Sequence, residues 1–467
     1  MNETVAQAIL AAERQGVLPI TSGCPFTCIF CSNRYNPPGL NVYHIGPRPL
    51  EEIQAHLDAM PEQGRVVIGE SATRVNEGEP FSHPQILPIL EAVRRRFPAA
   101  VIALTTGAPR LERATVNRLA ALAPLEVTVS LNSADAEVRR RVMGDLDPVG
   151  ALNTVDRLAT AGLTLYGSAV ALPFVVGWED VYRTLAFLDE RGFAWSRLFV
   201  PAYTRRTPEA LRYPVGLPAS LRDFAAQIRP DLSMPVSVEP PRVTGLESEI
   251  AGIRPGSPAD KAGLKRGDIV RGIGGRQPFC QVEAHTWATE EAGPAVTAGR
   301  RDGDETTEVT LEKGCGESPG WVMDYDIDPE RARRAAELLW HHRGRTALVL
   351  TSELAFAVVG FALDALGWGG LGPSGGATLE AVANRFFGGS VAAAGLLTVG
   401  DICDHLGWPL DDRGRPSTDS EPRHRPHEPW PEVLILPREP FDHSGRDLRG
   451  VSWRDLTAAL RVKVELV

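Results

Sequence analysis

Three cysteines lie close together near the start of the chain, where residues 24–31 read Cys-Pro-Phe-Thr-Cys-Ile-Phe-Cys. Thiolates at Cys24, Cys28 and Cys31 can ligate three irons of one cubane iron–sulfur cluster. They supply no fourth thiolate, so one iron is left open to another ligand. A structural zinc site is the alternative, but zinc favours four ligands, often in two pairs, and the next cysteine is Cys280. We therefore expect a [4Fe–4S] cluster at this loop.

The C-x₃-C-x₂-C spacing, with Phe30 directly before the last cysteine, resembles the signature of the radical SAM superfamily. The resemblance implies that S-adenosylmethionine (SAM) chelates the open iron and that an electron cleaves it to a 5′-deoxyadenosyl radical. It also implies that Phe30 lies against the adenine. The expected partners are a low-potential electron donor, such as flavodoxin or ferredoxin, and an unidentified substrate that is a small molecule or a peptide.

Composition and charge narrow the class of protein. The chain has 467 residues, 43% hydrophobic and 23% charged, which is ordinary for a globular protein of several domains. A formal net charge of -10 argues against non-specific binding to nucleic acid, which needs a basic face. The other cysteines, Cys280, Cys315 and Cys403, stand singly and form no disulfide framework, so we expect a reducing, cytoplasmic location.

No segment predicts a membrane span or a signal peptide. The first fourteen residues lack an apolar core. The most apolar region, residues 346–370, is interrupted by Glu353 and Asp364, whereas a span needs about 20 nearly uncharged residues. We therefore expect a soluble protein without a membrane partner.

Strand and helix signals alternate through the first half of the chain. Apolar runs suited to buried parallel strands occupy residues 18–20, 65–68, 101–104, 125–131, 163–172 and 198–201. Amphipathic helical segments lie between them, at residues 49–60, 83–97, 113–122, 148–161 and 179–191. About six β/α units predict a parallel sheet with helices outside it. The resemblance implies the partial (β/α)₆ barrel of radical SAM enzymes over residues 1–238.

Ligands of such sheets bind at the carboxyl ends of the strands, so the strand-end residues are site candidates. Gly69 and Glu70 resemble part of the family's Gly-Gly-Glu stretch, whose backbone receives the amino group of SAM; an ordinary turn is the alternative. Ser130 and Asn132 are expected to bind the ribose hydroxyls or the methionyl carboxylate of SAM. Ser168, on the fifth predicted strand, is expected to face the adenosine.

Other polar residues near strand ends are weaker candidates. Thr105 and Thr106 suit either the pocket lining or a strand cap. One arginine of residues 139–141 suits the SAM carboxylate, because a planar fork matches a carboxylate. Tyr203 and Thr204 are candidate groups on the substrate side.

Residues 256–275 resemble a bacterial PDZ domain, and we assign residues 241–328 to a small β-rich PDZ-like domain. A helix at 257–262, a strand at 269–273 and a hairpin at 300–312 are expected. PDZ domains usually bind peptide C-termini by adding a strand to a sheet edge. The binding loop is expected near residues 244–246, and we favour docking or intramolecular packing over peptide capture.

Residues 329–467 predict an α/β C-terminal domain, with helices at 329–341 and 354–366, a strand at 347–350 and a mobile loop near 411–431. The stretch 382–398, with 434–437 and 451–456, resembles the C-terminal domain of a bacterial family called domain of unknown function 512. Asn384, Arg385 and His443 are its polar residues most suited to a binding loop. Bracing of the loop is the alternative for the first two.

The sequence thus predicts an α/β chain in which a radical SAM partial barrel precedes the PDZ-like and C-terminal domains. The implied function is a radical SAM enzyme that abstracts hydrogen from an unidentified substrate. The alternative is a non-catalytic iron–sulfur scaffold or redox sensor that binds a protein partner through its last two domains. A SAM enzyme that releases no free radical is a further alternative.

Overall fold

Alternating apolar strands and amphipathic helices fold into two compact units in a computed structural model. The described residues are 3–70, 74–301, 305–368, 376–412, 414–418 and 429–467. The first unit comprises residues 1–35, 42–201 and 207–240, and the second comprises residues 36–41, 202–206 and 241–467. The domain boundaries drawn from the sequence stay a prediction.

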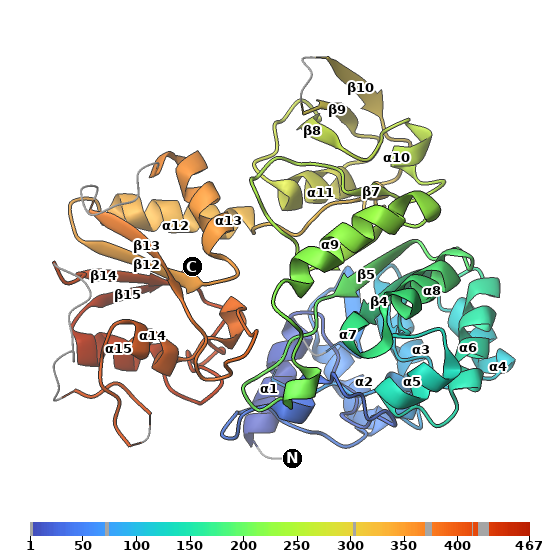
Figure 1. Cartoon of the computed structure of the whole chain (residues 1–467), viewed down its shortest axis with the longest axis horizontal. Helices are drawn as coiled ribbons and strands as arrows, with labels where there is room; N and C mark the ends of the chain where they lie inside the picture. The colour runs from blue at the N-terminus through green and yellow to red at the C-terminus, as the bar shows by residue number, and fades with distance from the viewer. Residues whose placement is uncertain (1–2, 71–73, 302–304, 369–375, 413, 419–428) are drawn as a thin grey trace. The chain divides into compact units, whose positions relative to one another are not determined.

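The first unit contains a six-stranded parallel sheet whose strands follow one another in chain order. Its strands are β1 (Arg65–Ile68), β2 (Val101–Thr106), β3 (Leu125–Ser130), β4 (Thr164–Val170), β5 (Trp195–Phe199) and β6 (Val236–Glu239). Its helices are α1 (Glu3–Arg14), α2 (Leu50–Ala59), α3 (Ile86–Arg96), α4 (Arg113–Ala120), α5 (Ala136–Met143), α6 (Pro148–Thr160), α7 (Pro173–Val176), α8 (Trp178–Asp189) and α9 (Leu217–Ile228). Figure 1 shows these helices around the sheet, which confirms the predicted partial barrel.

The two faces of this sheet differ in burial. Along β3, residues such as Val127 and Val129 are fully buried in the core that the helices complete. Their neighbours Thr128 and Ser130 point to the opposite face and are only partly buried, because successive side chains of a strand alternate between faces. The opposite face is therefore the one that can hold a ligand.

Two strands differ from the sequence prediction. Residues 18–20 do not form the first strand: the described contact there is an isolated parallel bridge between Val17 and Val67. Pro19 has no backbone N–H to donate to a ladder, which accounts for the short pairing. The sixth strand is β6 instead, and it follows α9; neither element was predicted.

The region predicted to be PDZ-like contains short elements in the predicted order. They are β7 (Gly252–Ile253), α10 (Pro258–Lys261), β8 (Asp268–Ile273), α11 (Gln281–Glu290), β9 (Ala295–Arg300), β10 (Thr306–Thr310) and β11 (Trp321–Val322). The hairpin of β9 and β10 is confirmed, although its turn at residues 302–304 lies outside the described residues. The loop near residues 244–246 precedes β7 and has no regular structure.

The C-terminal segment folds into a second α/β sheet with helices on both faces (Figure 1). Its elements are α12 (Pro329–His341), β12 (Ala347–Ser352), α13 (Phe356–Leu363), β13 (Ala377–Val382), α14 (Val399–His405), β14 (Val433–Leu436), α15 (Trp453–Leu460) and β15 (Lys463–Leu466). The strands are parallel, in the order β13-β12-β14-β15. Figure 1 shows α12 and α13 on one face of this sheet and α14 and α15 on the other. The predicted loop 411–431 lies partly outside the described residues.

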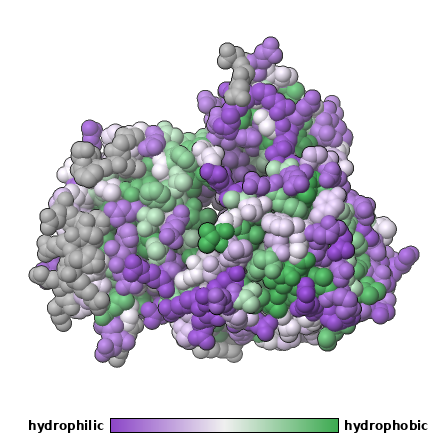
Figure 2. Space-filling view, in the orientation of Figure 1, coloured by the Kyte–Doolittle hydropathy of each residue, from purple (hydrophilic) through white to green (hydrophobic). Residues whose placement is uncertain are grey.

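Figure 2 shows hydrophilic residues interspersed with hydrophobic ones over the visible face. Within the described ranges, no helix is long and apolar enough to cross a bilayer.

Candidate active site

The cysteine loop, residues 24–31, has no regular secondary structure and is fixed by its backbone. The N–H of Thr27 donates to the carbonyl of Met143 over 2.8 Å, and the N–H of Ile29 donates to that of Val142 over 2.9 Å. Both carbonyls belong to the last turn of α5, where carbonyls lack partners within the helix. Gly144 ends that helix in the left-handed region (φ 64°). The loop therefore satisfies the helix end, and the helix end positions the loop.

A second anchor precedes the loop. The N–H groups of Gly78 and Glu79 donate to the carbonyls of Thr21 and Gly23, both over 2.8 Å. The hydroxyl of Ser82 also donates to the carbonyl of Gly23, over 2.8 Å. A Cβ atom on Gly78 would overlap the backbone of Gly23, so only glycine permits this approach.

The three thiols interact electrostatically with one another. Burial, together with the charges of Cys31 and Cys24, raises the pKa of Cys28 to about 12. Burial also raises the pKa of Cys24, with a contribution from Cys31. Cys24 is exposed and the other two are half-buried. Cys24 and Cys28 are therefore protonated at neutral pH without a metal, and ligation must displace their protons.

The donor set fits a cluster better than a single ion. In the part of the chain that the structure describes, no three His, Cys, Asp or Glu side chains are arranged to hold one metal ion. A cubane does not need that arrangement, because each thiolate ligates a different iron. Three neighbouring thiols on a fixed, partly exposed loop are what such a cluster requires.

A buried carboxylate that the sequence reasoning missed lies next to this loop. Glu79 accepts hydrogen bonds from Oγ1 of Thr106 over 2.6 Å and from the N–H of Gly107 over 2.7 Å. Burial raises the pKa of Glu79. The Gly78–Glu79 pair, rather than Gly69–Glu70, packs against the cysteine loop. The sequence signal that could have identified Glu79 is this second Gly-Glu pair, which is followed by Pro80.

Gly69 and Glu70, which the sequence predicts to bind the amino group of SAM, lie at the end of β1. Gly69 has a positive φ of 82°, and its N–H donates to Glu77 over 3.3 Å. Glu70 is exposed, directly before the undescribed residues 71–73. A role for this pair in binding SAM stays a prediction.

Arg139 is completely buried beside the cysteine loop. Its Nη1 donates to the carbonyl of Leu131 over 2.6 Å, and its Nη2 donates to the carbonyl of Gly107. Its Nε pairs with Asp145 over 2.6 Å. Its guanidinium lies 5.6 Å from the ring centre of Phe26, inside the cysteine loop. These contacts make Arg139 a brace; the pairing of one arginine of residues 139–141 with the SAM carboxylate stays a prediction.

The partly exposed face of the sheet brings several predicted residues together. Ser130 and Ser168 are register partners on β3 and β4, and Ser168 is the partner of Arg197 on β5. Arg197 lies against the rings of Trp195 and Phe199, at 5.7 and 5.3 Å. Sequence reasoning missed Arg197, because the strand phase that decides its face was unknown.

Asn132 connects the ends of two strands. Its Oδ1 accepts from the N–H of Val170 over 2.8 Å, and its Nδ2 donates to the carbonyl of Ser130 over 3.1 Å. It also has a positive φ of 62°. The side chain therefore holds β3 against β4; its predicted role in binding SAM is untested. Phe30 is partly buried in the cysteine loop, and contact with adenine stays a prediction.

The other candidates belong to the second unit. The N–H of Tyr203 donates to Oγ of Ser390 over 3.0 Å, and the N–H of Ser390 donates to the carbonyl of Tyr203 over 2.9 Å. Asn384 is buried and bonds the carbonyl of Leu396 over 2.7 Å, which favours bracing of its loop. Arg385, like His443, is exposed.

Comparison with known families identifies two parts of the chain. Residues 18–188 match the model of the radical SAM superfamily, and residues 249–281 match that of a PDZ domain. GTP 3′,8-cyclases of two Actinobacillus pleuropneumoniae strains, serotypes 5b and 3, are each 27% identical to this chain over 164 residues. That match covers 34% of this chain and 46% of each relative, so the chain spans less than half the length of these relatives.

Solved structures show the same kind of partial similarity. Streptococcus suis SuiB bound to the precursor peptide SuiA is 17% identical, with 48% of each chain covered and a TM-score of 0.38. The enzyme anSMEcpe with bound AdoMet and a peptide is 13% identical, with 46% of this chain and 59% of that chain covered and a TM-score of 0.35.

The family match covers the cysteine loop and most of the parallel sheet, and the PDZ match covers β7 to the start of α11. The resemblance of the C-terminal segment to domain of unknown function 512 stays a prediction. The chain thus contains a radical SAM domain followed by a PDZ domain, and the radical SAM family implies a [4Fe–4S] cluster and S-adenosylmethionine as its cofactors.

Proposed function

We propose that this chain is a radical SAM enzyme in which Cys24, Cys28 and Cys31 ligate the [4Fe–4S] cluster. The observation that carries the proposal is the cysteine loop, fixed on one side by the end of α5 and on the other by Gly78 and Glu79. When bound, the cluster and SAM supply reductive cleavage to a 5′-deoxyadenosyl radical that abstracts hydrogen from a small-molecule or peptide substrate.

The protein's own residues hold and orient these groups. Cys28 must lose its proton on ligation, since burial raises its pKa to about 12. We assign Glu79 and the backbone around it to the amino group of SAM. Ser130 and Ser168 offer hydroxyls on the partly exposed sheet face, where ribose hydroxyls would find hydrogen bonds.

Arg197 supplies the positive charge of this face. Its guanidinium lies between two aromatic rings, and a planar fork suits a carboxylate. We assign it to the carboxylate of SAM or to an acidic group of the substrate.

The test is anaerobic reconstitution with iron and sulfide, followed by incubation with SAM and dithionite. The expected results are about four irons per chain and release of 5′-deoxyadenosine. Cys28→Ala should lose both, whereas Cys315→Ala, which removes an exposed thiol outside the loop, should keep both.

Two outcomes would replace the proposal. A protein that binds the cluster but never cleaves SAM would be the iron–sulfur scaffold or redox sensor. Cleavage to a different SAM fragment would indicate an enzyme that releases no free radical. Zinc in place of iron would exclude the radical SAM enzyme, the iron–sulfur scaffold or sensor, and the SAM enzyme that releases no free radical.

A further inference from the structure

The strand order of the C-terminal sheet marks a position where ligands bind. From β12 the chain moves outward to β13, then returns to the other side of β12 for β14 and β15. The core residues Val349 and Ile435 pack with α12 and α13, whereas Leu350 and Leu434 pack with α14 and α15. The sheet is therefore doubly wound, and its order reverses between β12 and β14. In such sheets ligands bind outside the carboxyl ends of the strands at the reversal.

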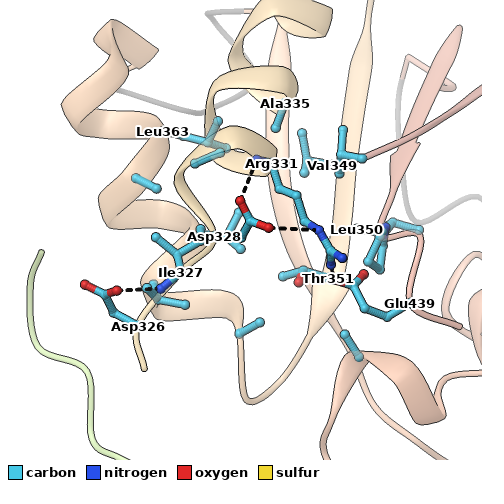
Figure 3. A pocket seen from close by; sticks show the side chains of 18 of the residues that line it. Asp326, Ile327, Asp328, Arg331, Ala335, Val349, Leu350, Thr351, Leu363 and Glu439 are labelled. Carbon is cyan, nitrogen blue, oxygen red and sulfur yellow. Dashed lines mark hydrogen bonds and ion pairs between the residues drawn. The ribbon is translucent and has the colours of Figure 1, made fainter. Parts of the chain in front are cut away.

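A cavity of about 190 Å³ lies at this position, as Figure 3 shows. Its walls come from the end of β12, from α12 and α13, and from the segment after β14. The lining is mostly aliphatic and includes Ala335, Val349, Leu350, Val359 and Leu363. An apolar cavity of about 150 Å³ binds benzene in an engineered protein. The space is therefore large enough for a phenyl ring or a branched aliphatic side chain.

Four charged residues, Asp326, Asp328, Arg331 and Glu439, also line the cavity. Arg331 pairs with Asp328 over 3.4 Å and with Glu439. The side chains of Arg331 and Glu439 are 48% and 37% exposed, which places this pair at the solvent-facing side. Figure 3 shows both side chains reaching toward the same end of the cavity.

The nearby aspartates are already committed to the backbone. Asp328 caps α12, where it accepts from the N–H groups of Glu330 and Arg331. Asp326 accepts from the N–H groups of Gln281 and Val282 at the start of α11. Among the charged residues of the lining, Arg331 and Glu439 are therefore left to recognise a ligand. An exposed ion pair contributes little to stability, so a ligand can replace it at small cost.

We propose that this cavity binds a free α-amino acid with an apolar side chain. The side chain fills the aliphatic space, the carboxylate bonds the guanidinium of Arg331, and the ammonium bonds the carboxylate of Glu439. The opposite charges of Arg331 and Glu439 at the mouth complement the two charges of a zwitterion. A ligand with a single charge would pair with one of these residues and would lie beside the other, whose charge has the same sign as that of the ligand. This site is independent of the proposed radical chemistry.

Isothermal titration calorimetry of the full chain tests the ligand class. L-phenylalanine, L-leucine and L-methionine are the probes, and 3-phenylpropionate and 2-phenylethylamine each lack one charge of phenylalanine. The amino acids should bind, and each analogue should bind at least roughly tenfold more weakly, since one charge-assisted hydrogen bond is lost. Analogues that bind as well as phenylalanine, or amino acids that fail to bind at millimolar concentration, would overturn the proposal.

Matched variants test the assigned residues. Arg331→Met and Glu439→Gln should weaken binding at least tenfold, and Ala335→Leu should abolish it by filling the cavity. Arg334→Met and Glu337→Gln remove an exposed pair of the same helix that does not line the cavity, so they should bind as the parent does. Circular dichroism of each variant verifies folding, and equal weakening in both pairs of variants would contradict the assignment.

Discussion

Arg139 and Asp145 form a buried ion pair, with 2.6 Å between Nε and Oδ2, beside the loop that carries the three cysteines. The same guanidinium bonds the carbonyls of Leu131 and Gly107, at the ends of two different strands. One side chain thus connects α5, the sheet and the ring of Phe26.

Replacing Arg139 by methionine should destabilise the fold by about 3 kcal/mol, because the buried carboxylate of Asp145 loses its partner. The cluster loop should also load less iron. Arg140→Met is the control, because Arg140 is exposed and pairs with the exposed Glu137, so its loss should cost less than about 1 kcal/mol. Urea unfolding and iron analysis provide the measurements. Equal effects of the two substitutions would show that Arg139 is not a brace.

Comparing Gly144→Ala with Gly162→Ala separates the effect of a steric clash from the effect of backbone strain. Gly144→Ala places a Cβ atom against Oγ1 of Thr27 in the cysteine loop. Gly162 has a similar positive φ of 71° and open space at its Cβ position. Gly162→Ala should therefore cost only the backbone strain, about 1 kcal/mol, whereas Gly144→Ala should cost more and also lower iron loading.

A double variant checks the cause of the Gly144 effect. Thr27→Ala removes the hydroxyl that the new Cβ meets, so Gly144→Ala with Thr27→Ala should recover part of the iron content. If the double variant loads no more iron than Gly144→Ala alone, the contact with Thr27 is not the reason.

Glu77 gives the fold a defined dependence on pH. Burial raises the pKa of Glu77 from 4.5 to about 8. Between these values the folded protein holds a proton that the unfolded chain releases, so this contribution to stability is present at low pH and is lost as pH rises toward 8. The slope is at most about 1.4 kcal/mol per pH unit.

Glu77→Gln should remove this slope, because the amide does not titrate. Its stability relative to the parent should therefore rise from about pH 5 to pH 8 in urea unfolding experiments. Glu51→Gln, an exposed position on α2, should leave the slope unchanged. Parallel profiles of the parent and Glu77→Gln would contradict the assignment.

Asn384 and Arg385 are neighbours with different expected roles. The buried amide of Asn384 donates to the carbonyl of Leu396 and accepts from the N–H of Phe387. Asn384→Ala should destabilise the fold by about 2 kcal/mol, because two backbone groups lose their partner. Arg385→Ala, at an exposed position, should change stability by less than about 0.5 kcal/mol. Thermal unfolding measures both, and similar losses would assign Arg385 a bracing role as well.

The sequence by itself determined the features that depend on local pattern. Spacing of Cys24, Cys28 and Cys31 indicated the cofactor, and alternating apolar runs predicted β1 to β5 and most of the helices. Short periodic signals report local conformation well, because one turn or one strand contains the whole pattern.

Only the tertiary structure decided which distant residues meet. It placed Glu79 rather than Glu70 beside the cysteines, buried Arg139 as a brace and set Ser130, Ser168 and Arg197 on one face. It also formed the cavity near Arg331. Each outcome depends on strand register and long-range packing, where a shift of one residue exchanges the two faces of a strand. No local pattern contains that information.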